Sequence, residues 1–87
     1  MSYPDVAPGT ITVANVIGPV TPSGTINGIN DTFTLASTPA AGFELFRNGI
    51  LQEGSGGDYT LTTATIVYTA GSIPQTGDKH VAYYVIT

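Results

Sequence analysis

Glycine and proline recur along this chain and divide it into short stretches, which favours strands over long helices. Eleven glycines and six prolines are spread over the 87 residues. Val, Ile, Thr, Tyr and Phe together make up 37 of the 87 positions. These branched and aromatic side chains fit a pleated sheet and lose rotamer freedom in a helix. The sequence therefore predicts an all-β fold.

The size and charge of the chain exclude several classes of function. We expect one small domain with a thin core, in which residues 1–9 form an extended N-terminal arm and residues 10–87 a single β domain. Two basic residues stand against six acidic ones, a formal net charge of −4. So few cations favour neither a nucleic acid nor an anionic membrane as partner. Because the chain has no cysteine, extra stability is expected from partner subunits or a larger assembly.

Alternation of apolar and polar residues predicts about seven short strands. Turn residues between the strands favour a small antiparallel β-sandwich or a partly closed barrel. Gly18-Pro19 is expected to end the first strand. The predicted strands cover residues 10–17, 31–36, the hairpin 43–52, 58–62, 65–69 and 79–86, and a short strand at 25–30 is expected to be interrupted by Asn27-Gly28. The side chains expected to point inward include Phe33, Leu35, Tyr59, Leu61, Ile66 and Tyr68.

The dipeptide Asn48-Gly49 is the sharpest local signal in the chain. It lies between two apolar stretches and is the preferred chemistry for a two-residue hairpin turn, because both turn positions need a positive φ. Such a turn places Phe46 opposite Leu51 on one face of the hairpin and Leu45 on the other. Both faces carry apolar side chains, so the sequence leaves open which of them meets the core.

The sequence offers no catalytic constellation. His80 is the only histidine, and beside Lys79 at the start of a strand it is expected to be exposed or at an edge. No neighbouring residue supplies a nucleophile and an orienting acid. Asp31, Asp58 and Asp78 each follow Gly or Asn at a strand entry, a placement typical of carboxylates that accept backbone N–H groups. We therefore expect neither an enzyme nor a bound cofactor or metal.

Both ends of the chain are candidates for contacts with other subunits. The strand at 79–86 is apolar on both faces, which a domain with one solvated face does not require. The arm at 1–9 contains two prolines, whose fixed φ lowers the entropy lost when an extended segment docks. The residues expected in intersubunit contacts are Tyr3, Pro4, Val6, Tyr84 and Ile86.

Two stretches together resemble small β modules of bacteriophage virion proteins. Residues 21–39 read TPSGTINGINDTFTLASTP and resemble a segment that precedes a β-hairpin in such proteins. Residues 43–84 contain FELFRNG, then a hydrophobic pair, GGDYTL, TIVYT and TGDKHVAYY. Modules of this kind occur in tail fibres, baseplates and capsid-decorating proteins. The matching positions are turn and core residues, so the resemblance implies a scaffold and carries over no catalytic residue.

This resemblance implies a structural protein of the virion. We expect a decoration or cement protein on the capsid surface, a homotrimer whose partners are the major capsid protein and copies of itself. The alternative is a tail-fibre or baseplate component that recognises a host glycan through exposed aromatic residues beside Asp or Asn side chains in a groove. A small head–tail connector stays open as a third interpretation.

Overall fold

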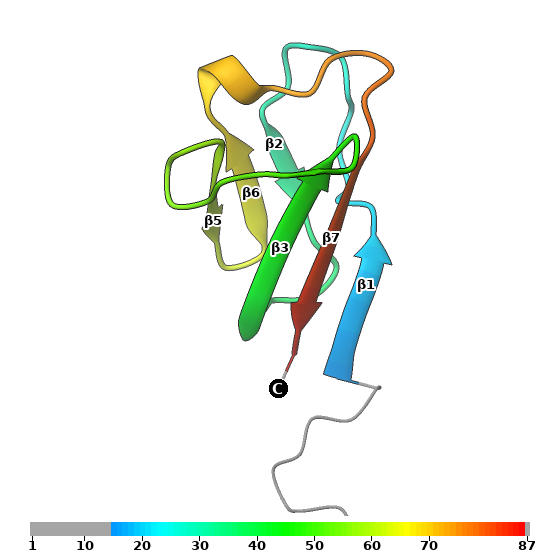
Figure 1. The fold of residues 1–87 in the computed structure, drawn as a ribbon, viewed down its shortest axis with the longest axis vertical. Helices are drawn as coiled ribbons and strands as arrows, with labels where there is room; N and C mark the ends of the chain where they lie inside the picture. Colours follow the sequence, from blue (N-terminus) through cyan, green and yellow to red (C-terminus); the bar gives the residue numbers. More distant parts are fainter. Residues whose placement is uncertain (1–14, 87) are drawn as a thin grey trace, which may run out of the picture.

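The computed structural model of the chain describes residues 15–86. They form two antiparallel sheets that pack as a small sandwich and do not close into a barrel, so the expected all-β fold is confirmed (Figure 1). The strands are β1 (Val16–Val20), β2 (Thr32–Thr34), β3 (Ala41–Arg47), β4 (Ile50–Leu51), β5 (Tyr59–Thr62), β6 (Thr65–Tyr68) and β7 (His80–Val85). A short 3-10 turn, η2 (Ala70–Ser72), lies between β6 and β7.

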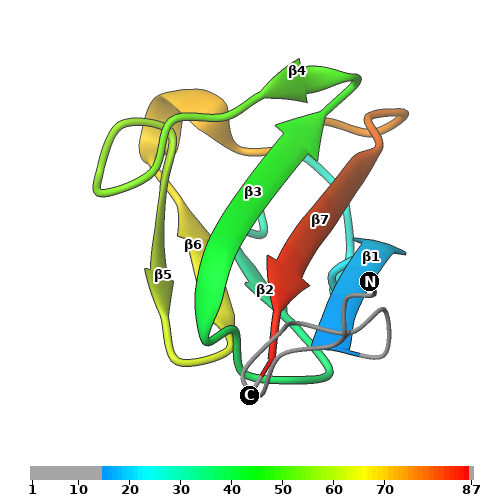
Figure 2. The ribbon, with the colours of Figure 1, turned by 60° about the horizontal axis from the view of Figure 1, so that its bottom comes forward.

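The two sheets form the two layers of the sandwich. The first has the strand order β1-β7-β3-β4 and the second the order β2-β6-β5. Figure 2 shows the four-stranded sheet crossing in front of the smaller one, with β4 at its upper edge. Side chains from both sheets meet between the layers and form the core. Its buried apolar members are Phe33, Leu35, Leu45, Tyr59, Ile66, Tyr68, Ala82 and Tyr84.

The three-stranded sheet follows the alternation of its sequence. Phe33 pairs with Ile66, and both side chains are fully buried in the core. The residues on either side of them point outward and are mostly threonines. Clean alternation of this kind is typical of a sheet with one packed and one solvated face.

The turn between β3 and β4 contains Asn48 and Gly49. Their φ angles are 55° and 82°, so both occupy the left-handed region that a tight two-residue hairpin requires. Phe46 is the partner of Leu51 in the resulting ladder. The inner face of this hairpin is the one that carries Leu45, which is fully buried, whereas Leu51 is exposed.

The first strand differs from its prediction at Gly18-Pro19. This dipeptide does not end the strand, because β1 continues through it to Val20. The pairing of β1 with β7 changes register between Ile17 and Val20, so the dipeptide is accommodated as an irregularity on an edge strand. An edge strand tolerates proline, because the missing N–H faces away from the ladder. Residues 10–14 of the predicted strand lie outside the described residues.

Residues 25–30 do not form the predicted strand. The side-chain oxygen of Asn27 accepts hydrogen bonds from the backbone N–H groups of Ile29 and Asn30, each at 2.9 Å. The side-chain amide of Asn30 donates to the carbonyl oxygens of Thr25 and Thr32. These local bonds satisfy backbone groups that a strand would offer to a ladder, so the segment folds as a series of bends.

Candidate functional site: the outer face of the four-stranded sheet

The four-stranded sheet presents a largely apolar face to the outside of the domain. Its register aligns Val16 with Val85, and Phe46 with both Val81 and Leu51. Leu51 is 56% exposed and Val16 is 50% exposed. We call this surface the outer apolar face. It consists of Val16 on β1, Glu44 and Phe46 on β3, Leu51 on β4, and Val81, Tyr83 and Val85 on β7.

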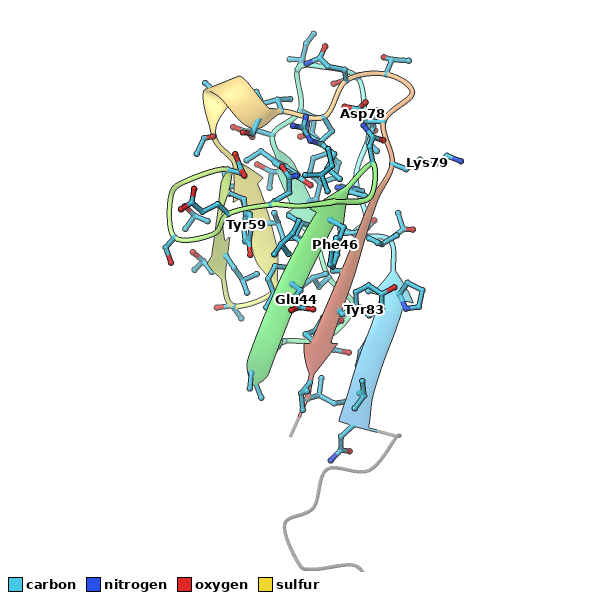
Figure 3. All side chains as sticks on the ribbon, in the orientation of Figure 1. Glu44, Phe46, Tyr59, Asp78, Lys79 and Tyr83 are labelled. Atoms are coloured by element: carbon cyan, nitrogen blue, oxygen red, sulfur yellow. The ribbon has the colours of Figure 1, made fainter. Side chains whose placement is uncertain are left out.

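An aromatic pair lies in the middle of the outer apolar face. The rings of Phe46 and Tyr83 meet edge to face with centroids 5.9 Å apart. Tyr83 is 37% exposed, and its ring also packs closely over Gly18 of β1. A Cβ atom at position 18 would lie 2.6 Å from Cδ2 of Tyr83, so only glycine permits this approach. Figure 3 shows Glu44, Phe46 and Tyr83 on the same outward side of the sheet.

One carboxylate interrupts this apolar surface. Glu44 is the Cα partner of Tyr83 and is exposed beside the aromatic pair. Within residues 15–86 its carboxylate takes part in no hydrogen bond and no ion pair. A charged group without a partner, beside an apolar aromatic pair, is available to a cation on another molecule.

The outer face of the three-stranded sheet has a different character. One row across it contains Thr32, Val67 and Thr60, and the next contains Thr34, Thr65 and Thr62. Threonine hydroxyls remain hydrogen-bonded to water on a solvated sheet surface. The two outer faces of the sandwich therefore differ, because one is polar and uncharged and the other is apolar.

Two aspartates stabilise loops at the ends of strands. Asp58 accepts hydrogen bonds from the backbone N–H of Glu53 at 2.7 Å and from the Ser72 hydroxyl at 3.0 Å, and these bonds lower its pKa. Asp78 accepts from the side-chain amide of Asn48 at 3.0 Å and from the backbone N–H of Gln75 at 2.8 Å, which lowers its pKa in the same way. Both carboxylates thus act as local acceptors, as their positions in the sequence predicted.

His80 is buried, so the expectation that it is exposed or at an edge is wrong. The side chain is 2% exposed, and its ring packs edge to face against Phe33 with centroids 4.6 Å apart. Its Nδ1 lies 2.9 Å from the hydroxyl oxygen of Tyr68. Burial lowers the pKa of His80. Its contacts within residues 15–86, to Tyr68 and Phe33, are those of a core residue.

At β7 the structure overturns Tyr84 as a residue of an intersubunit contact, whereas Ile86, which is half-buried, stays a prediction. Tyr84 is 2% exposed and belongs to the core, and Ile86 packs against the core. The opposite face of the strand, which carries Tyr83, is the one that points outward. Tyr3, Pro4 and Val6 of the predicted arm lie outside the described residues.

Sequence reasoning therefore missed the outer apolar face, although one residue could have revealed it. Glu44 shares its face with Phe46 and Leu51, and an ionised side chain points to solvent far more often than into a core. That single charge identifies the outward face of the β3–β4 hairpin. Through the pairing of Glu44 with Tyr83 it also identifies the outward face of β7.

Comparison with protein-family models, curated proteins and solved structures found no match to this chain. Within residues 15–86 no cavity is present, and no three His, Cys, Asp or Glu side chains lie close enough together to hold a metal ion. None of the helical residues in this range forms a segment long and apolar enough to cross a membrane. The fold and the site define a small β-sandwich with one solvated polar face and one exposed apolar face.

Proposed function

We propose that this chain is a structural protein of a bacteriophage virion that decorates the assembled capsid and has no enzymatic activity. The outer apolar face carries the proposal, because contiguous apolar surface on a small domain is typical of a site that another protein covers. The resemblance of residues 21–39 and 43–84 to phage modules supports a virion as the place where that contact is made.

The proposed mechanism is mechanical. Each subunit contacts the major capsid protein and further copies of itself, so rupture of the shell must also break these contacts. A protein that binds the assembled shell and not its separated subunits stabilises the shell by mass action. The predicted arm at 1–9, which lies outside the described residues, is the segment that we expect to reach the shell.

The experiment compares particles with and without the protein. Negative-stain images are expected to show that particles without the protein rupture at a lower temperature. As the salt concentration is reduced, these particles are also expected to rupture earlier than complete ones, and added protein is expected to restore their resistance. A protein without residues 1–9 is expected to fold and to occupy the particles less fully. Unchanged resistance of the depleted particles would exclude the cementing role.

A matched pair of variants tests whether the outer apolar face contributes. Val16→Ser and Val67→Ser remove the same side chain from exposed positions on opposite sides of the sandwich. Val16 belongs to the outer apolar face and Val67 to the threonine-rich face. Val16→Ser is expected to lower occupancy on particles, whereas Val67→Ser is expected to leave it unchanged.

A glycan-binding component of the tail is the second candidate. The observation that favours it is the partly exposed ring of Tyr83, which lies beside the carboxylate of Glu44 and could stack on a sugar. The flat outer apolar face, without a cavity among residues 15–86, favours a protein partner over a sugar. Saturable binding on a glycan array that Tyr83→Ala abolishes would favour the tail component.

A further inference from the structure

One acidic side chain lies on the outer apolar face, and one basic side chain lies at its border. Glu44 is the acid, and Lys79 lies one residue before β7, in phase with the outward-facing Val81 and Tyr83. Figure 3 shows the Lys79 side chain extending sideways from the start of β7, beyond the border of the sheet. Within residues 15–86 the Lys79 ammonium forms no ion pair, whereas Arg47, the other cation of the chain, lies 3.7 Å from Asp78.

The two charges are placed on opposite sides of an apolar row. The ladder puts Leu51, Phe46 and Val81 side by side across three strands. Glu44 is level with position 83, two residues beyond this row along β7, and Lys79 lies two residues before it. At about 3.3 Å per residue the two charged positions are roughly 13 Å apart along the strand, with the row midway between them.

We propose that a second copy of this chain packs face to face on the outer apolar face, about a twofold axis that runs along the row of Leu51, Phe46 and Val81. This axis exchanges the levels of Glu44 and Lys79, so each carboxylate approaches the ammonium group of the other copy. The apolar row meets its own copy at the centre. Two sheets packed in this way lie about 10 Å apart, as in a sandwich.

Charge complementarity favours a second copy as the occupant. A twofold contact requires a self-complementary surface, in which residue i meets residue j and residue j meets residue i. An acid and a base at equal distances from an apolar row meet this requirement. A ring of three would need two different patches on each subunit, so this contact is a pair and differs from the homotrimer that the resemblance implies.

The inference deepens the proposed function, since it assigns the self-contact to one surface, but its test needs no particle. A chain that pairs in solution and fails to bind particles would overturn the proposed function alone. A chain that binds particles and remains a monomer in solution at all concentrations would overturn the pairing alone.

The first measurement is the molar mass of the full chain in solution. Sedimentation equilibrium over a wide range of concentrations is expected to show reversible association from 8.9 kDa to twice that mass. A purely monomeric protein at the highest soluble concentration overturns the proposal. A species of three chains overturns the twofold axis.

Charge exchange tests the pairing of Glu44 with Lys79. Glu44→Lys and Lys79→Glu each place like charges opposite one another and are expected to raise the dimer Kd by about tenfold. The combined variant, with the same net charge as the natural chain, is expected to recover a Kd within about threefold of the original. Glu53→Lys is the control, because it makes the same charge change at an exposed loop position outside the face.

The combined variant tests whether Glu44 and Lys79 meet across the interface. If the combined variant associates as weakly as the single variants, Glu44 and Lys79 do not meet across the interface and the proposed axis is wrong. Circular dichroism melting of each variant establishes that a loss of association is not a loss of folding. Because Glu44, Lys79 and Glu53 are all exposed, the four variants are expected to melt within a few degrees of the natural chain.

Discussion

Tyr68 and His80 join the two sheets of the sandwich inside its core. The hydroxyl oxygen of Tyr68 on β6 lies 2.9 Å from Nδ1 of His80 on β7, and both side chains are almost fully buried. Both rings pack edge to face against Phe33 of β2. Nε2 of His80 has no hydrogen-bond partner among the described residues. One polar contact and one unpartnered nitrogen therefore lie at the joint between the layers.

The buried contact between Tyr68 and His80 predicts that the domain loses stability in mild acid. Burial lowers the pKa of His80 below 6.5, so between that value and the lower folded value the unfolded chain binds more protons than the folded one. The stabilisation is thus fully present above pH about 6.5 and is lost as the pH falls. The melting temperature is expected to drop as the pH falls below about 6.5.

A neutral substitution isolates this effect. His80→Gln is expected to melt at a lower temperature than the natural chain but with little dependence on pH in the same interval. Asp58 and Asp78 do not contribute to the pH dependence in this interval. Their pKa values are lowered in the folded chain, so their effect on stability appears below pH about 3.8. An equal acid dependence in His80→Gln and in the natural chain would contradict the assignment to His80.

The hydrogen bond itself is tested by removing one hydroxyl. Tyr68→Phe leaves the buried ring of His80 without a partner at Nδ1, which is expected to lower the free energy of unfolding by about 1–3 kcal/mol. Tyr83→Phe makes the same chemical change at a partly exposed position and is expected to change it by less than about 0.5 kcal/mol. Urea denaturation measures both, and equal midpoints for the two variants would show that the bond contributes nothing.

A third prediction concerns backbone strain at Gly49 in the hairpin turn. Its φ of 82° lies in the left-handed region, and nothing lies within 4 Å of the position that a Cβ atom would occupy. Gly49→Val therefore measures backbone strain alone and is expected to destabilise the domain by about 1–3 kcal/mol. Gly71→Val also enters open space, at a position without a positive φ, and is the control. Similar thermal melting of the two variants would contradict the assigned turn.

The three-stranded sheet could be predicted from the sequence and the four-stranded sheet only in part. Around Phe33 and Ile66, threonines alternate with apolar side chains, so the alternation itself identifies the inner face. Along β7 both faces are apolar, and a choice that is wrong by one residue inverts the whole strand. For this reason the sequence predicts Tyr84 at an interface, whereas the structure exposes Tyr83.

Two further differences between the sequence predictions and the structure have causes that local patterns do not report. One is a contact between residues distant in sequence, and the other is a set of side-chain hydrogen bonds. The burial of His80 depends on Tyr68, twelve residues earlier, and on Phe33 in the other sheet, and no local pattern reports such contacts. At 25–30 three β-branched residues suggest a strand, but the Asn27 side chain bonds to the backbone two and three residues later. Side-chain bonds of this kind compete with the ladder, and propensity does not include them.

Asn48 provides the last prediction, because it does more than occupy a left-handed turn position. Its side-chain amide donates to Asp78 at 3.0 Å, and its side-chain oxygen accepts from the backbone N–H of Lys79 at 2.9 Å. The hairpin turn is thereby tied to the segment that leads into β7. Asn48→Gly keeps the positive φ and removes both side-chain hydrogen bonds. The variant therefore separates the effect of the turn geometry from the effect of these bonds to Asp78 and Lys79.

The expected result of Asn48→Gly is a rise in the pKa of Asp78. The bond from Asn48 is the main cause of the lowered pKa of this carboxyl, so the variant is expected to move it back toward 3.8, whereas the pKa of Asp58 is expected to stay unchanged. NMR titration of the side-chain carboxyl carbons measures both groups in one sample. If the pKa of Asp78 stays as low as in the natural chain, the backbone N–H of Gln75 alone holds it there, and the tie between turn and strand is weaker than the geometry indicates.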